Sequence, residues 1–118
     1  MALSPGRTKT IESSSLYGNL NLLILRSLEG GALHGLAIAR EIVGRSGEVL
    51  RIEEGALYPA LHRLERDGYV RGDWGVSEQN RRAKFYALTR AGRALLERER
   101  ASWVRHTEAV AKVLGHVW

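Results

Sequence analysis

A short polar stretch past the middle of the chain carries several groups that bind phosphate. The letters NRRAK place Arg81, Arg82 and Lys84 close together, and Gln79 and Asn80 add two amides beside them. Guanidinium and ammonium groups are the usual protein contacts to nucleic-acid phosphates. Two interpretations follow: a solvated run of charge, or a narrow projection that contacts phosphates or enters a minor groove.

A second stretch has the pattern of a helix with one face free for recognition. In EEGALYPALHRLERDGYV, Leu57, Leu61 and Leu64 recur at helical spacing and predict a face packed on a core. The other faces offer small residues, a ring and hydrogen-bond donors, which suit close approach to DNA and contacts in a major groove. The candidate DNA contacts are Gly55, Ala56, Tyr58, Pro59, His62 and Arg63.

These contacts have structural alternatives that the residues alone leave open. Tyr58 could pack against the neighbouring hairpin, and His62 and Arg63 could simply be solvated. For Arg66, which stands between Glu65 and Asp67, we expect solvation.

Pro59 interrupts the pattern of this helix. A proline inside a helix removes one backbone donor and crowds the carbonyl four residues earlier, which here belongs to Gly55. Because Gly55 has no side chain, the backbone there has room to adjust. We expect a distorted first turn that the leucine face still anchors, with Tyr58 and Pro59 facing DNA.

The chain lacks the constellations that are typical of enzymes and metal sites. None of its 4 histidines has His or carboxylate neighbours at ligand spacing on an apolar background. There is also no nucleophile elbow, P-loop or dinucleotide fingerprint. We therefore expect no catalytic residue, no metal and no cofactor, and we expect His34 to cap the helix that it opens.

The composition fits one small basic domain. The 118 residues carry a formal net charge of +5, a pI near 10.1 and no cysteine. The charge favours an acidic partner, and the lack of cysteine excludes disulfides and thiolate metal sites. The sequence shows no apolar leader and no run long enough to span a bilayer, so it predicts a cytoplasmic protein without membrane contact.

The elements that would position these groups follow from periodicity and turn residues. Residues 1–14 are polar and without a period, and they predict a mobile tail with Arg7 and Lys9. The expected helices cover residues 15–29, 34–45, 54–67 and 90–116. A serine is available to cap the first helix, and Thr89 can cap the last. The runs YVRGDWG and AKFYALT predict a β-hairpin around the polar tip, with a loop longer than two residues and Trp74 in the core.

This order of elements predicts a fold that is mainly α with a small β-hairpin. It is a winged helix-turn-helix followed by a dimerisation helix. The winged helix-turn-helix would span residues 15–89, with the hairpin as its wing, and residues 90–118 would form the dimerisation helix.

The last helix carries an apolar repeat in which Leu96, Trp103, Val110 and Val117 are spaced by seven. We expect this stripe to form the seam of a homodimer, because a domain this small has little surface left to cover it. The alternative is packing on its own domain. Trp103 in turn could be simple core packing or could wall an aromatic ligand pocket between subunits.

Several segments resemble the PadR family of transcriptional regulators, in its smaller subfamily with one C-terminal helix. The segments are GALHGLAIAREI, EEGALYPALHRLERDGYV, NRRAKFYALTRAGRALLERE and the region around Trp103. The string G-x-LYPxLxRLExxGxV begins at Gly55, and RRxxxYxLTxxG begins at Arg81. The resemblance spans about Leu16 to Val110.

The resemblance implies a homodimeric repressor that binds an inverted-repeat operator in double-stranded DNA and responds to a small aromatic or hydrophobic effector. Two positions depart from the family pattern. Ala56 lacks the hydroxyl that is common there, and Glu53 replaces a common serine cap and would repel a nearby phosphate. The alternative function is a module on the same fold that binds a small molecule or a protein without specific operator binding.

Overall fold

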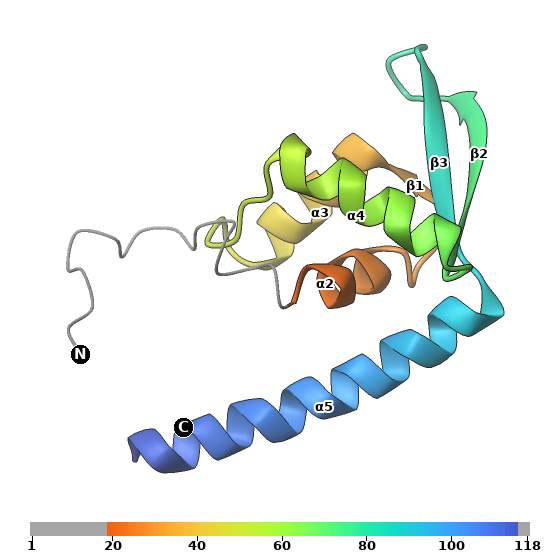
Figure 1. The fold of residues 1–118 in the computed structure, drawn as a ribbon. Coiled ribbons are helices and arrows are strands. Elements are labelled where there is room, and N and C mark those ends of the chain that lie inside the picture. Colours follow the sequence, from red (N-terminus) through yellow and green to blue (C-terminus); the bar gives the residue numbers. More distant parts are fainter. Residues whose placement is uncertain (1–18, 116–118) are drawn as a thin grey trace.

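The computed structural model describes residues 19–115, which form a layer of helices, a small sheet at one end and a long helix beneath them (Figure 1). The elements are α2 Leu20–Ser27, β1 Leu33–His34, α3 Gly35–Arg45, α4 Glu54–Arg66, β2 Val70–Val76, β3 Arg82–Leu88 and α5 Arg90–Leu114. Helices α3 and α4 form the helix-turn-helix unit, and β2 and β3 form the wing. The predicted winged helix-turn-helix with an additional C-terminal helix is confirmed.

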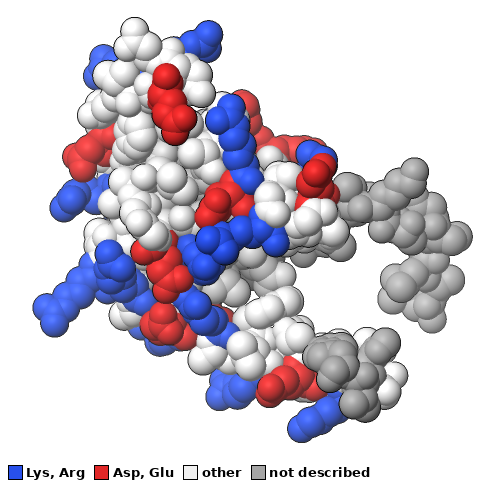
Figure 2. All heavy atoms as spheres, turned by 180° about the vertical axis from the view of Figure 1, so that it is seen from behind, with Lys and Arg blue, Asp and Glu red and all other residues white. Residues whose placement is uncertain are grey.

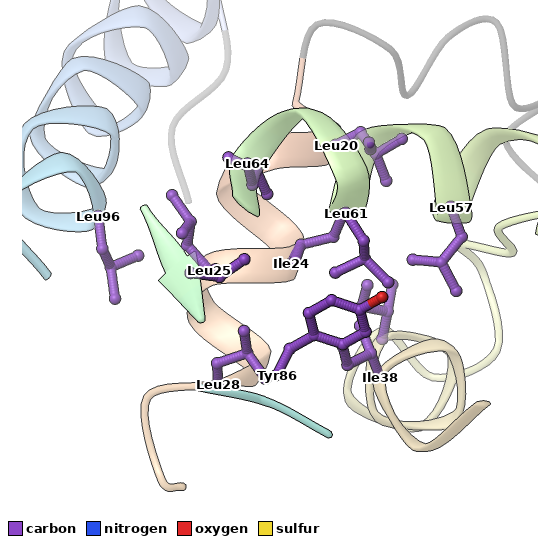
Figure 3. Packing of buried hydrophobic residues seen from close by; sticks show 13 residues of the cluster. Leu20, Ile24, Leu25, Leu28, Ile38, Leu57, Leu61, Leu64, Tyr86 and Leu96 are labelled. Atoms are coloured by element: carbon purple, nitrogen blue, oxygen red, sulfur yellow. The ribbon is translucent and has the colours of Figure 1, made fainter. Parts of the chain in front are cut away.

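The hydrophobic core lies where α2, α3, α4 and the sheet meet. Ile24 and Leu25 of α2 are fully buried there, together with Ile38 of α3 and Leu61 of α4. Figure 3 shows Tyr86 of β3 beside Ile38, so the sheet closes the same core. Helix α2 contacts α3, α4 and α5, which explains why its sequence is apolar on nearly all sides.

The helix ends follow local capping signals. The Nδ1 atom of His34 accepts a hydrogen bond from the backbone N–H of Ala37 at 3.3 Å, which confirms His34 as the cap of α3. At the end of α4, the N–H of Tyr69 donates to the carbonyl of Leu64 across Gly68, whose φ is 83°. This geometry is a Schellman motif, in which glycine avoids the strain of a left-handed backbone.

Helix α4 remains continuous through Pro59, so the expected distortion does not break its first turn. The carbonyl of Glu53 accepts from the N–H groups of both Ala56 and Leu57 at 3.0 Å, a shared acceptor that is common at helix ends. Pro59 and Gly55 are both exposed, in agreement with the outer position expected for Pro59. The helical bond that Pro59 cannot make is therefore missing at the surface and not in the core.

The sheet has a strand that the sequence does not predict. β1 pairs antiparallel with β3, which places His34 opposite Phe85, and the strand order is β1-β3-β2. Two residues are too few to show the alternation that reveals a strand. In the hairpin, the N–H of Ser77 donates to the carbonyl of Arg81 at 2.8 Å, and Asn80 has a left-handed φ of 59°. The loop is longer than two residues, as predicted.

The expectation that Trp74 lies in the core is wrong. β2 and β3 extend beyond the helices (Figure 1), and the side chain of Trp74 is 61% exposed on this overhang. The hairpin pattern of apolar and aromatic residues indicates a strand, but it does not reveal where the strand outruns the layer that covers it.

Some predicted boundaries differ from the structure or fall outside it. Helix α2 ends at Ser27, two residues before the expected end, and Leu28 caps it. The expected serine cap, the tail of residues 1–14 and Val117 lie outside the described residues.

The first turn of α5 is fastened to the base of the hairpin. The Oγ1 atom of Thr89 accepts from the N–H of Gly92 at 3.0 Å and donates to the carbonyl of Gly68 at 2.6 Å. Gly92 is buried, and a Cβ atom at this position would collide with the carbonyl oxygen of Tyr69. The Leu-Thr-x-x-Gly string therefore combines a helix cap with a close approach of two backbones.

An ion pair connects the middle of α5 to the end of α2. The Nη2 atom of Arg100 lies 2.9 Å from Oε2 of Glu29, and Nε of Arg26 lies 3.3 Å from Oε1 of the same carboxylate. The hydrogen bond from Arg100 holds the pKa of Glu29 below its ordinary value. Because all of these side chains are partly exposed, water screens the interaction.

We predict that Gly92→Ala lowers the free energy of unfolding by about 1–3 kcal/mol, because the added methyl group overpacks the approach to Tyr69. Gly44→Ala is the control, since this glycine lies inside α3 with nothing within 4 Å of an added Cβ. Alanine there should stabilise the helix by about 0.5–1 kcal/mol. Urea unfolding measures both variants, and wild-type stability for Gly92→Ala would contradict the close approach.

We predict that Glu29→Gln lowers the urea midpoint at neutral pH and that this deficit disappears as the pH falls through the lowered pKa of Glu29. A carboxyl whose pKa is lowered by folding stabilises the protein above its ordinary pKa, and the contribution disappears as the pH falls through the folded pKa. Glu41→Gln, which removes an ion pair with Arg45 inside α3, is the control for removal of a surface carboxylate. A deficit that does not change with pH would show that it does not arise from the ionised Glu29 carboxylate.

Candidate nucleic-acid interface

A groove of about 660 Å³ separates the wing from the helix-turn-helix unit. Tyr58 and His62 line it from α4, Trp74 and Arg82 from the hairpin, and Arg40 from α3. None of the described residues that line the groove is Asp or Glu. The combination of rings and cations without acids suits an anionic ligand with apolar parts.

The outer face of α4 presents the predicted contacts in two rows. Tyr58 and His62 face the groove beside the wing. Gly55, Pro59 and Arg63 line a second hollow of about 310 Å³ on the other side of the helix. All five residues are exposed. The leucine periodicity therefore predicts correctly which face of α4 is free.

Tyr58 packs on α3. Its ring lies so close to Gly35 that a Cβ atom there would come within 2.7 Å of the Tyr58 hydroxyl oxygen. The same ring lines the groove together with Tyr86 of β3, so it lies between α3 and the hairpin. The side chain remains 37% exposed, so part of the ring stays accessible from the groove.

The start of α4 offers backbone groups and not side-chain donors. Ala56 is half-buried against the core, so only its main chain can approach a ligand. Glu53 makes no side-chain capping hydrogen bond, and Glu54 occupies the first turn. Both acids complement the positive end of the helix dipole. They also place negative charge beside the second hollow.

The two arginines at the wing tip pair with no acid among the described residues. Arg81 and Arg82 form no ion pair within residues 19–115, whereas Arg71 lies 3.3 Å from Asp73 on the same hairpin. In the view from behind, basic side chains flank the hairpin tip with an acidic side chain between them, and acidic and basic side chains are mixed lower down (Figure 2). Arg66, for which we expect solvation, is exposed and pairs with neighbouring Asp67 at 3.2 Å.

The expected place of Lys84 at the tip is corrected by the structure. Its Nζ atom lies 2.9 Å from Oε1 of Glu65, and its side chain is only 28% exposed. The hydrogen bond to Glu65 raises the pKa of Lys84. Residues alternate along a strand, so Lys84 shares with Tyr86 the face of β3 that looks toward α4. Lys84 therefore connects the wing to α4, with its charge already paired.

The sequence does not single out two residues of the groove. It predicts Trp74 in the core and gives Arg40 no role. A signal for Arg40 exists, because it is a charged residue on the side of α3 opposite the apolar, buried Ile38 and Ile42. Periodicity places it on the outer face, but only the tertiary structure shows that this face turns toward the wing.

The apolar stripe of α5 is covered over only part of its length. Leu96 is buried in the core of its own domain and so cannot lie at an open seam. Further along, Trp103 and Val110 are each 42% exposed, and Val113 and Leu114 are more exposed still. Ala111 in this second half of α5 is buried, so the half is only partly exposed, and Figure 1 shows α5 continuing past α2.

A hollow of about 270 Å³ lies between α2 and α5 beside Trp103. Leu22, Glu99 and His106 also line it, and the rings of Trp103 and His106 are 5.7 Å apart. Partial exposure means that Trp103 is not simply packed in the core of its own subunit.

Within residues 19–115, no three His, Cys, Asp or Glu side chains are grouped so that they could hold a metal ion. None of the helices described there has the length and apolar character needed to cross a bilayer.

Comparison with known proteins agrees with this architecture. The model of the transcriptional regulator PadR-like family matches residues 24–98. A transcriptional regulator of Mycobacterium tuberculosis is 37% identical over 100 residues, which cover 81% of this chain and 83% of that protein.

Solved structures show the same fold. A transcriptional regulator from Clostridium thermocellum aligns with a TM-score of 0.76 and 28% identity, over 87% of this chain and 97% of that one. A PadR family transcription regulator from Clostridium difficile aligns with a TM-score of 0.68 and 28% identity, over 82% and 98%. With the family match covering the whole helix-turn-helix unit, the whole wing and the start of α5, the chain belongs to the PadR-like family of transcriptional regulators.

Proposed function

We propose that this regulator is a cytoplasmic repressor that binds an inverted-repeat operator in double-stranded DNA as a homodimer. The observation that carries the proposal is the acid-free groove between α4 and the wing, with Arg81 and Arg82 outside any ion pair of the described residues at its outer edge. Free guanidinium groups beside an exposed helix supply the two kinds of contact that a winged helix makes, to phosphates and to base edges.

In this proposal α4 enters a major groove and the wing reaches the flanking backbone. Tyr58, His62 and Arg63 offer donors along the exposed face of α4, while Gly55 and Pro59 allow close approach. The main chain at Ala56 lies in the first turn, where the helix dipole favours a phosphate. Lys84 would support the wing from behind through Glu65, in place of the direct DNA contact expected from the sequence.

Exposed apolar side chains in the second half of α5 support the pairing of two chains. They are Trp103, Val110, Val113 and Leu114. An apolar stripe left in water on a helix of 25 residues is the kind of surface that a second helix buries. Two subunits that pair through this stripe would be related by a two-fold axis. Their two α4 helices would then reach successive major grooves, roughly 34 Å apart. Residues 15–89 would then bind DNA, and residues 90–118 would hold the dimer.

The hollow beside Trp103 supports a small aromatic or hydrophobic effector as the regulating ligand. It lies between α2 and α5, next to the stripe that would form the seam. A ligand that binds one arrangement of the two subunits better than another changes the spacing of the α4 helices and hence operator affinity.

We predict that the protein binds a duplex covering the promoter of its own gene more tightly than a scrambled duplex, as measured by fluorescence anisotropy. Arg81→Ala with Arg82→Ala should weaken binding to both duplexes. It should also make the plot of log K against log salt shallower by about 0.9 for each phosphate that the protein no longer neutralises.

The control is Arg45→Ala with Arg71→Ala, which removes the same charge from arginines that are paired with acids outside the groove. Its salt slope should stay at the wild-type value. Equal wild-type affinity for the two duplexes would contradict operator binding. A wild-type slope for the Arg81 and Arg82 variant would remove the wing from the interface.

We predict that Val110→Glu with Leu114→Glu produces a folded monomer with weakened operator binding, because two carboxylates cannot be buried in an apolar seam. Arg105→Glu is the control: it changes the net charge by the same amount on the opposite side of α5. Sedimentation measures the oligomeric state and circular dichroism the fold. A dimer that survives the double substitution would place the subunit contact elsewhere.

A further inference from the structure

Trp74 is an exposed tryptophan on the side of the wing that faces the groove. Its side chain is 61% exposed, and Val76, two residues further on the same face of β2, is 66% exposed. Neither residue belongs to the buried core of the described residues, and the hairpin extends beyond α3 and α4 (Figure 1). Large aromatic groups exposed beside a groove mark surfaces that bind something, and tryptophan is especially common at binding hot spots.

Arg82 lies against this tryptophan. The guanidinium carbon is 4.6 Å from the centroid of the Trp74 ring, within the range of a cation–π contact. The strand register places Arg82 opposite Val76, so Arg82 is the diagonal neighbour of Trp74 on the same face. A guanidinium that stacks flat on a ring keeps the N–H donors along its edge free. No ion pair within the described residues uses them.

The position of Trp74 and Arg82 beside the groove indicates which part of a DNA duplex they would contact. Across the groove lie Tyr58 and His62 of α4. If α4 is in a major groove and the wing borders the adjacent minor groove, the strand of sugars and phosphates between the two DNA grooves runs through this space. A deoxyribose presents an apolar surface and its phosphate an anion, so the two suit an indole ring and a guanidinium side by side.

We propose that Trp74 is a DNA-contacting residue that also positions Arg82. The indole ring packs on a deoxyribose at the edge of the minor groove, and Arg82, held by the ring, donates to the adjoining phosphate. The inference rests on the proposed function, since it assumes that the groove receives DNA.

The test compares Trp74→Ala, Trp74→Phe, Arg82→Ala and the combined Trp74→Ala with Arg82→Ala by anisotropy over a series of salt concentrations. Trp74→Ala should weaken binding roughly tenfold, the scale of an aromatic contact to a nucleotide. It should also make the salt slope shallower by up to about 0.9, as Arg82→Ala does. Trp74→Phe, which keeps an aromatic face, should retain the wild-type slope.

The combined variant separates positioning from simple contact. If the ring holds Arg82, the affinity decrease in the combined variant is smaller than the product of the two single decreases. Wild-type affinity for Trp74→Ala would overturn the contact. The positioning role would be overturned if the two single decreases in affinity multiply in the combined variant and Trp74→Ala keeps the wild-type salt slope.

The same measurements on a scrambled duplex separate this inference from operator binding. A backbone contact is independent of sequence, so Trp74→Ala should weaken binding to both duplexes by the same factor. A decrease confined to the promoter duplex would overturn the backbone contact. Equal wild-type affinity for both duplexes, with the full Trp74 effect on each, would instead overturn operator specificity and leave the contact supported. Circular dichroism should show an unchanged fold, because Trp74 lies outside the core.

Discussion

The burial of one face of α4 is the constraint on which the remaining structure depends. Leu57, Leu61 and Leu64 are buried there against the core that Ile24 and Tyr86 share. Each buried leucine contributes about 1.5–3 kcal/mol, so the three together exceed the roughly 3 kcal/mol that an interior proline costs. This difference explains why α4 continues through Pro59.

Burial of the leucine face of α4 also determines where the side chains on the opposite face point. Because residues recur every 3.6 positions, Tyr58 and His62 must emerge toward the wing and Arg63 toward the other side. The sheet depends on the same packing through Tyr86, and the ion pair between Lys84 and Glu65 holds the hairpin against α4. The groove is thus a result of core packing, because Tyr86 and Lys84, which hold the sheet against α4, also line it.

The sequence predicts most of this arrangement because most of it is local. Leucine spacing predicts the free face of α4, and the cap at His34 follows from a polar residue at a helix start. The errors arise where the result depends on distant segments. Lys84 and Arg82 look alike in the chain, yet one meets Glu65 and the other does not. Trp74 looks like a core residue because nothing nearby in the sequence shows where the hairpin leaves the helices. Leu96 and Val110 belong to one periodic stripe, but only the tertiary structure shows that Leu96 is buried and Val110 is exposed.

The fastening of α5 to the hairpin has a mechanical consequence. A helix of 25 residues is about 37 Å long, and it is a stiff rod. Its first turn is joined to the wing base through Thr89 and by the backbone contact at Gly92, with no flexible linker between. A tilt of α5 by about 10° about its C-terminal end would therefore move the wing by about 6 Å, because no hinge between helix and wing absorbs it. That displacement exceeds the roughly 3.4 Å that separates successive phosphates of one strand along the DNA axis. Helix α5 thus acts as a lever between its apolar end and the groove.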